Sequence, residues 1–175
     1  MIGKEMLMVV VLPYDLTWPD AFRQVALELR RALGNRIVAL HHIGSTSVPG
    51  LLAKPIIDML LEVSALEGLD RGNPQMRALG YEVMGAFGIE GRRYFRKSDA
   101  DGVRTHQIHA FQSGSPHLLR HLAFRDFLRA HPGVAEAYGA LKLELLGVSG
   151  QAGAYMDGKD AFVRRVEGEA LEWVV

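Results

Sequence analysis

The hydrophobic positions along this chain follow two patterns, one typical of strands and one typical of helices. Short, nearly continuous apolar runs indicate buried strands, whereas apolar residues that recur every three or four positions indicate amphipathic helices. The first pattern predicts strands over residues 6–14, 36–44, 55–63, 81–85, 92–97 and 103–112. The second predicts helices over residues 17–33, within 64–80, and over 117–130, 133–147 and about 154–172.

The order of these elements predicts the fold class. Strands fill most of the first two thirds of the chain, and helices fill the last third. The run "PIIDMLLEV" is apolar almost throughout, as in a central strand that is buried on both faces. We therefore expect an α/β fold of the mixed α+β kind, in which helices flank a mixed sheet. Residues 1–175 are expected to form one domain, with a sheet core over about 6–115 and C-terminal helices over about 117–172.

The turn after the second predicted strand carries the candidate chemistry. It begins with Gly44, Ser45, Thr46 and Ser47, and Asp58 follows in an otherwise apolar strand. A Gly-Ser turn followed by an acid at a strand start suits a nucleotidyltransferase, in which the turn holds phosphates and carboxylates hold divalent metal ions. The spacing leaves a second interpretation open, in which Asp58 forms a salt bridge and the serines only cap the turn.

The same turn is not a P-loop. A P-loop has four residues between its glycines and a lysine directly after the second glycine. Here five residues separate Gly44 from Gly50, and Lys54 comes four positions after Gly50. Lys54 is expected either to approach a phosphate group or to lie in solvent.

Several segments, in order along the chain, resemble one protein family. They are "HIGSTSVPGLLAKPIIDMLLEV", "GRRYFRK", "HQIHAF", "FRDFLRAHP", "YGALK" and the late pair Tyr155 and Lys159. Together they resemble the GrpB family, which is placed in the DNA polymerase beta-like nucleotidyltransferase superfamily. The resemblance implies a nucleotidyltransferase-like fold that binds a nucleoside triphosphate with a divalent metal, and a potential transfer of the nucleotidyl group to a small acceptor. It also implies that Lys142, Tyr155 and Lys159 line a cleft between the sheet and the helices.

The metal site that this resemblance implies is incomplete in the sequence. Members of the superfamily carry two acids separated by one residue, whereas this chain has Leu60 two positions after Asp58. His106 and His109 face opposite sides of a strand, and the resemblance favours His109 as the residue beside Asp58. Asp58 and His109 are therefore the expected catalytic residues and metal ligands, with Mg²⁺ or Mn²⁺ as the metal. The alternative for His109 is a hydrogen-bonded histidine of the core or cleft.

Basic residues near the turn are candidate phosphate ligands, each with a structural alternative. His42 is expected to contact a phosphate or to brace the turn. Arg92 and Arg93 face opposite sides of a predicted strand, which serves either as an anion clamp or as a charged edge strand. His117 and His121 are four positions apart in a predicted helix, a spacing that can bind a metal, but no acidic partner is near in the sequence and a solvated face is expected instead.

The composition limits the partners. Lys+Arg and Asp+Glu number 20 each, so no net charge attracts nucleic acid or an anionic membrane, and no cysteine is present to form thiolate metal sites. The apolar run at residues 6–12 is too short to span a bilayer, and a cytoplasmic location is expected. The expected partner is a nucleoside triphosphate or another phosphorylated small molecule, and a homo-oligomer is a further candidate.

Two other functions remain open beside nucleotidyl transfer. One is a catalytically silent module that binds a phosphate, a nucleotide or a coenzyme, and the absence of an acid at Leu60 favours it. The other is a protein-interaction module that uses the helical third of the chain.

Overall fold

The fold is given by a computed structural model, which describes residues 10–149 and 152–175. Residues 6–9 of the strand predicted at 6–14 lie outside this part of the chain, and the prediction is wrong for residues 10–14, which belong to no strand of the sheet. Of its described residues, Leu12 forms an isolated antiparallel bridge with Ala53.

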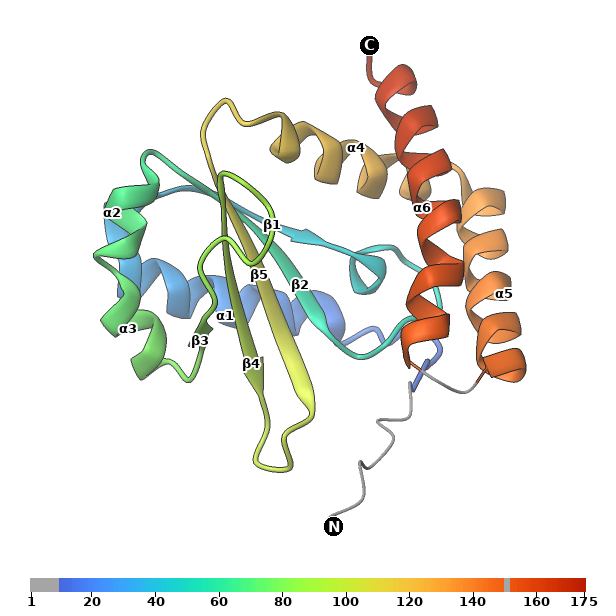
Figure 1. The fold of residues 1–175 in the computed structure, drawn as a ribbon, viewed down its shortest axis with the longest axis horizontal. Helices are drawn as coiled ribbons and strands as arrows, with labels where there is room; N and C mark the ends of the chain where they lie inside the picture. The colour runs from blue at the N-terminus through green and yellow to red at the C-terminus, as the bar shows by residue number, and fades with distance from the viewer. Residues whose placement is uncertain (1–9, 150–151) are drawn as a thin grey trace.

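Five strands form one mixed sheet in the order β1-β2-β5-β4-β3 (Figure 1). Their bounds are β1 Ile37–Ile43, β2 Ile57–Val63, β3 Glu82–Val83, β4 Arg92–Ser98 and β5 Arg104–Gln112. β2 and β5 run parallel, and the other neighbouring strands are antiparallel. The five strands predicted after residue 36 and the mixed α/β class are thereby confirmed.

Six α-helices accompany the sheet in the described part of the chain. They are α1 Trp18–Leu33, α2 Leu66–Asp70, α3 Asn73–Ala78, α4 Pro116–Ala130, α5 Pro132–Ser149 and α6 Ala152–Trp173. α1 ends as predicted at Gly34, whose φ of 59° a side chain would strain. The helix predicted within 64–80 is present as α3, with Pro74 in its first turn, and the structure adds the short helix α2 before the chain turns at Gly72. A Cβ at Gly72 would lie 2.7 Å from Cδ2 of Leu33, so this turn packs directly on the end of α1.

The helices divide between the two faces of the sheet. One face packs Met59 and Leu61 of β2 against Leu29 and Leu33 of α1. The alternate residues of the same strand point the other way, and Leu60 packs with Leu118 of α4. Each side of β2 therefore has an apolar cover, and this accounts for the nearly continuous apolar run in its sequence.

The last three helices form a helical layer that meets the sheet through α4, and Figure 1 shows α5 and α6 side by side at one end of the sheet. α4 and α6 are in contact, as are α5 and α6. A further apolar cluster joins these helices to Val48 and Leu51, which follow the Gly-Ser turn. This cluster attaches the helical layer to the turn. None of the helices in the described part of the chain has the length and apolar character that a bilayer crossing requires.

The core position of α1 leads to a stability prediction. Leu29 is fully buried, whereas Leu27 on the same helix is 51% exposed. Leu29→Ala is expected to lower the free energy of unfolding by about 2–5 kcal/mol, because it leaves a cavity against the sheet. Leu27→Ala is expected to change it by about 0.5 kcal/mol or less. Urea denaturation of both variants checks this, and equal losses would contradict the assigned packing of α1.

Candidate functional site

The centre of the candidate site is a contact between Gly44 and Asp58. Gly44 follows β1 with φ 72° and ψ −176°, a region that is almost restricted to glycine. A Cβ at Gly44 would lie 2.5 Å from Oδ2 of Asp58 and 2.9 Å from its Cβ. The Asp58 side chain therefore occupies the space beside Gly44. This contact places the carboxylate next to the start of the turn.

Three of the predicted phosphate ligands brace the turn from within. The Ser47 hydroxyl donates to the Gly44 carbonyl at 2.5 Å, and the Thr46 hydroxyl donates to the Ile56 carbonyl at 3.0 Å. Thr46 then accepts from His42 Nε2 at 2.9 Å. The ring of His42 stacks on Phe22 of α1, on the opposite face of the sheet from Asp58. Burial lowers the pKa of His42 to about 4, so it is neutral and fits the bracing role.

Lys142 on α5 reaches the turn from 97 residues further along the chain. Its amino group donates to Ser45 Oγ at 2.5 Å and to the Leu52 carbonyl at 2.8 Å. The ring of Tyr138, one helical turn earlier, lies 4.1 Å from the amino group. Lys142 is only 2% exposed. Burial, and then the charges of Lys159 and Lys54, lower the pKa of Lys142 to about 7.

Two more lysines complete this side of the site. The amino groups of Lys54 and Lys159 lie 5.1 Å and 5.5 Å from the ring centroid of Tyr155. Burial lowers the pKa of both lysines, and Lys159 lowers that of Lys54 further. With Lys142, Ser45 and Asp58 they line a cavity of about 140 Å³, which we call the lysine cavity. The cleft position that the family resemblance implied for Lys142, Tyr155 and Lys159 is confirmed.

His109 and Arg92 lie on the other side of Asp58. His109 Nε2 is 3.9 Å from Asp58 Oδ1, so the sequence correctly predicted which β5 histidine lies there. Arg92 Nη1 lies 3.4 Å from His109 Nδ1. Because arginine can only donate, Nδ1 is the acceptor and the proton of the neutral ring is on Nε2.

These groups do not fit a resident divalent metal. No set of three or more histidine or acidic side chains that could hold a metal occurs in residues 10–149 and 152–175. Leu60, where a second acid would stand, is fully buried in the apolar cluster under α4. A histidine that binds a metal through Nε2 donates its Nδ1–H to an acceptor, but here Arg92 presents a donor to that atom. One carboxylate and His109 therefore make a poor cage for Mg²⁺ or Mn²⁺.

Three of the basic residues lie differently from their predictions. Arg93 lies on the opposite face and forms a two-point ion pair with Asp70, at 2.7 Å and 3.0 Å, so it does not reach the site. His117 and His121 were expected in solvent, and this is wrong. His117 stacks on Phe111 at 4.9 Å, and His121 lies 5.5 Å from the His109 ring, because this face of α4 covers the sheet.

Two residues of the site, Tyr138 and Arg120, were not predicted from the sequence. The sequence did contain a signal for Tyr138. Ala135, Tyr138 and Lys142 are spaced by three and four positions and so share one helix face, which places Tyr138 beside the predicted site residue Lys142. Arg120 had no comparable signal. It hydrogen-bonds to His117 and His121 and forms a 2.7 Å ion pair with Glu167 of α6, a residue 47 positions away.

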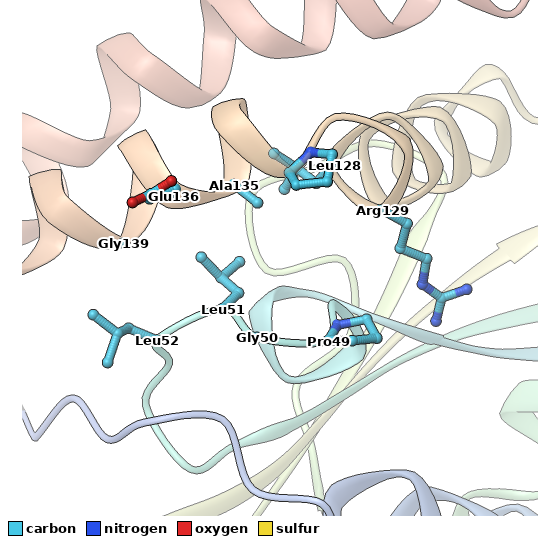
Figure 2. A pocket seen from close by; sticks show the side chains of 10 residues that line it. Pro49, Gly50, Leu51, Leu52, Leu128, Arg129, Ala135, Glu136 and Gly139 are labelled. Atoms are coloured by element: carbon cyan, nitrogen blue, oxygen red, sulfur yellow. The ribbon is translucent and has the colours of Figure 1, made fainter.

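A larger hollow of about 720 Å³ lies outside this site. Figure 2 shows it between Leu51 and Leu52 on one side and Ala135 and Gly139 of α5 on the other. Its walls are mostly apolar, and Arg129 at its edge donates to the Ser47 carbonyl at 2.9 Å. It contains none of the predicted site residues.

Comparison with known proteins identifies the family of this chain. The family model described as GrpB protein matches residues 8–169. The chain belongs to the GrpB family. GrpB from Enterococcus faecalis has a crystal structure with 42% sequence identity and a TM-score of 0.89, and the match covers 94% of this chain and 99% of that one.

Two curated relatives extend beyond the matched region. YqkA of Bacillus subtilis is 42% identical over 166 residues, which are 94% of this chain and 48% of that protein. A dephospho-CoA kinase of Mycobacterium tuberculosis is 29% identical over 187 residues, with 93% of this chain and 46% of that protein covered. The chain therefore spans about half the length of each.

A more distant structural likeness supports the nucleotidyltransferase-like fold. The Cid1 poly(U) polymerase with Mg 3′-dATP bound matches with a TM-score of 0.53 and 14% identity, over 76% of this chain and 41% of that one. At this identity the likeness shows the fold alone. The nucleotidyltransferase-like fold predicted from the family resemblance is thereby confirmed.

The Gly44–Asp58 contact can be tested by a double-mutant cycle. Gly44 and Gly50 both have positive φ, but a Cβ at Gly50 meets nothing within 4 Å. Gly50→Ala is expected to cost about 1–2 kcal/mol of unfolding free energy. Gly44→Ala is expected to cost about 1–3 kcal/mol more, and this excess should shrink when Asp58→Ala is also present. Urea denaturation measures Gly50→Ala, Gly44→Ala, Asp58→Ala and the double variant of Gly44 and Asp58. Equal costs for the two glycine substitutions, with no coupling between Gly44 and Asp58, would refute the contact.

The buried amino group of Lys142 predicts a pH dependence of stability. Its pKa is about 7 in the folded protein against 10.5 as the ordinary value. Between these values the unfolded chain holds a proton that the folded protein has released, so unfolding free energy rises with pH by at most about 1.4 kcal/mol per unit. Lys142→Met should remove this rise. Urea denaturation of the wild type and the variant from pH 6 to 9 checks this prediction. A difference in unfolding free energy between the two proteins that stays constant over this range would contradict it.

Proposed function

We propose that the protein binds the phosphate groups of a nucleotide or another phosphorylated small molecule in the lysine cavity. The observation that carries this proposal is the convergence of Lys54, Lys142 and Lys159 on one cavity beside the Ser45 hydroxyl, with Asp58 as the carboxylate in its wall. Three amino groups against one carboxylate leave excess positive charge in a confined space. A phosphate group supplies the missing negative charge.

The lowered pKa values of the lysines support this assignment. Each amino group is held in an environment that disfavours its charge. An anionic ligand between them offsets both the burial and the repulsion, so ligand binding stabilises the protonated forms. The lysine cavity is smaller than the ~300–1,000 Å³ of typical small-molecule sites, so it accommodates a compact group of the ligand, not a whole nucleotide.

A second candidate function is transfer of a nucleotidyl group. The likeness to the fold of Cid1, which has been solved with a magnesium nucleotide, favours it. Here the metal would arrive with the nucleotide as part of the substrate, since Mg²⁺ in such sites is held by one or two carboxylates and the substrate phosphates. Asp58 would be the carboxylate. The similarity to dephospho-CoA kinase makes a phosphorylated coenzyme a further candidate ligand.

Calorimetric titration with tripolyphosphate and ATP tests the first proposal. The titrations are made in EDTA at pH 6.5, where Lys142 is protonated. Binding without metal is expected, and Lys142→Met should weaken it about ten- to hundredfold, since a hydrogen bond to a charged group contributes about 1.5–3 kcal/mol. Lys97→Met is the matched control, because Lys97 lies on the other face over Tyr81 and its loss should leave affinity unchanged. Absence of binding, or equal losses in both variants, would reject the lysine cavity.

Asp58→Asn separates the two candidate functions. In EDTA this variant should bind ATP at least as tightly as the wild type, because a carboxylate that repels phosphate is gone. If the protein acts on a magnesium nucleotide, Mg²⁺ should strengthen ATP binding in the wild type and not in Asp58→Asn. Pyrophosphate release with an acceptor would then establish transfer. Cytoplasmic location and oligomeric state stay predictions.

A further inference from the structure

A second cavity lies on the other side of Asp58. It measures about 420 Å³ and lies between the sheet and helices α4 and α6. Asp58, Gln107, Met156 and Lys159 line both this cavity and the lysine cavity, so the two share a wall. Its volume falls within the ~300–1,000 Å³ range of small-molecule sites.

Arg92 places a buried positive charge in the wall of this second cavity. The residue is 8% exposed and forms no ion pair with any acid in the described part of the chain. Its Nε and Nη2 donate to the carbonyls of Ala86 at 3.1 Å and Phe87 at 2.8 Å. Phe87 has a φ of 47°, a strained value for a bulky residue. The carbonyl of this strained residue is one of the two that hold the guanidinium, and a buried charge without a carboxylate partner is costly unless a bound anion offsets that cost.

Arg120 adds a second guanidinium to the same wall. Its acidic partner is Glu167, and its remaining contacts are with His117 and His121, which accept its hydrogen bonds. Burial, and then the charges of Arg120, His109, His117 and Arg92 in that order, lower the pKa of His121 to about 3. No carboxylate contributes to this shift. Burial lowers the pKa of Lys159 at the shared wall, and Asp58 and the remaining acid of the cavity, Asp160, partly offset this shift.

We propose that Arg92 and Arg120 form a second anion site, which binds the carboxylate or phosphate group of a second small molecule beside Asp58. Planar guanidinium groups match either oxyanion with paired hydrogen bonds. Ile89, Phe124 and Val163 line the same cavity and provide contacts for an apolar portion of that molecule. The anion site rests on its own geometry, whereas its role as the site for an acceptor of a phosphorylated group rests on the proposed function.

Histidine side-chain NMR gives a readout that is separate from the lysine cavity. Inorganic phosphate and acetate are titrated separately into Lys142→Met protein at constant pH and ionic strength, with chloride as the reference anion. The imidazole signals of His109 and His121 are expected to move and reach saturation, while His42 on the other face does not respond. The anion that saturates at the lower concentration identifies the preferred oxyanion.

Two arginine variants complete the test. Arg92→Gln in the Lys142→Met background should weaken the anion affinity, measured from the saturable shift, at least tenfold. Arg120→Gln should weaken it to the same extent and replaces Arg92→Gln if that variant does not fold. Arg93→Gln is the matched control, because its side chain pairs with Asp70 on the opposite face, and it should keep the shift. No saturable shift for either anion, or a shift that survives both Arg92→Gln and Arg120→Gln, would overturn the second site. Failure of the lysine cavity instead shows as unchanged calorimetric affinity in Lys142→Met, so the two failures are distinguishable.

Discussion

The Asp58 side chain lies against the Cα of Gly44, and the geometry of the whole site depends on this contact. A Cβ at Gly44 would come within 2.5 Å of the carboxylate, so any other residue would force the turn and β2 apart. The contact fixes the carboxylate at the point where the two cavities meet. It also places Ser45, the next residue, where Lys142 can reach its hydroxyl.

The balance of charge around Asp58 differs from that of a two-metal site. The neighbouring position on the same strand face is Leu60, which packs with Ile43, Phe111 and Leu118. An acid there would be buried among apolar side chains, at a high cost in desolvation. The positive charge at the site comes instead from lysine and arginine side chains that line the two cavities.

The helical layer provides much of this charge, and its attachment to the turn is therefore part of the site. Val48 and Leu51 pack with α4, α5 and α6 in one apolar cluster. Arg125 and Arg129 of α4 add hydrogen bonds to the carbonyls of His42 and Ser47, at 3.2 Å and 2.9 Å. Because the helices are held to the turn in this way, Lys142 and Lys159 are positioned before any ligand binds, and a ligand need not order them.

The strands from residue 36 onward and the family could be predicted from the sequence. Strict alternation along a strand placed His106 and His109 on opposite faces, and the family resemblance favoured His109 as the residue beside Asp58. The sequence also showed that a second strand acid is missing. The helix faces that meet the sheet could not be predicted, because helical periodicity identifies a face without naming its partner. Packing of α4 therefore placed the half-buried His117 and His121 against the sheet, where solvent had been expected, and packing of α5 brought Lys142 to Ser45 across 97 residues. Local patterns carry no information about contacts at such separations, since these depend on how the layers pack.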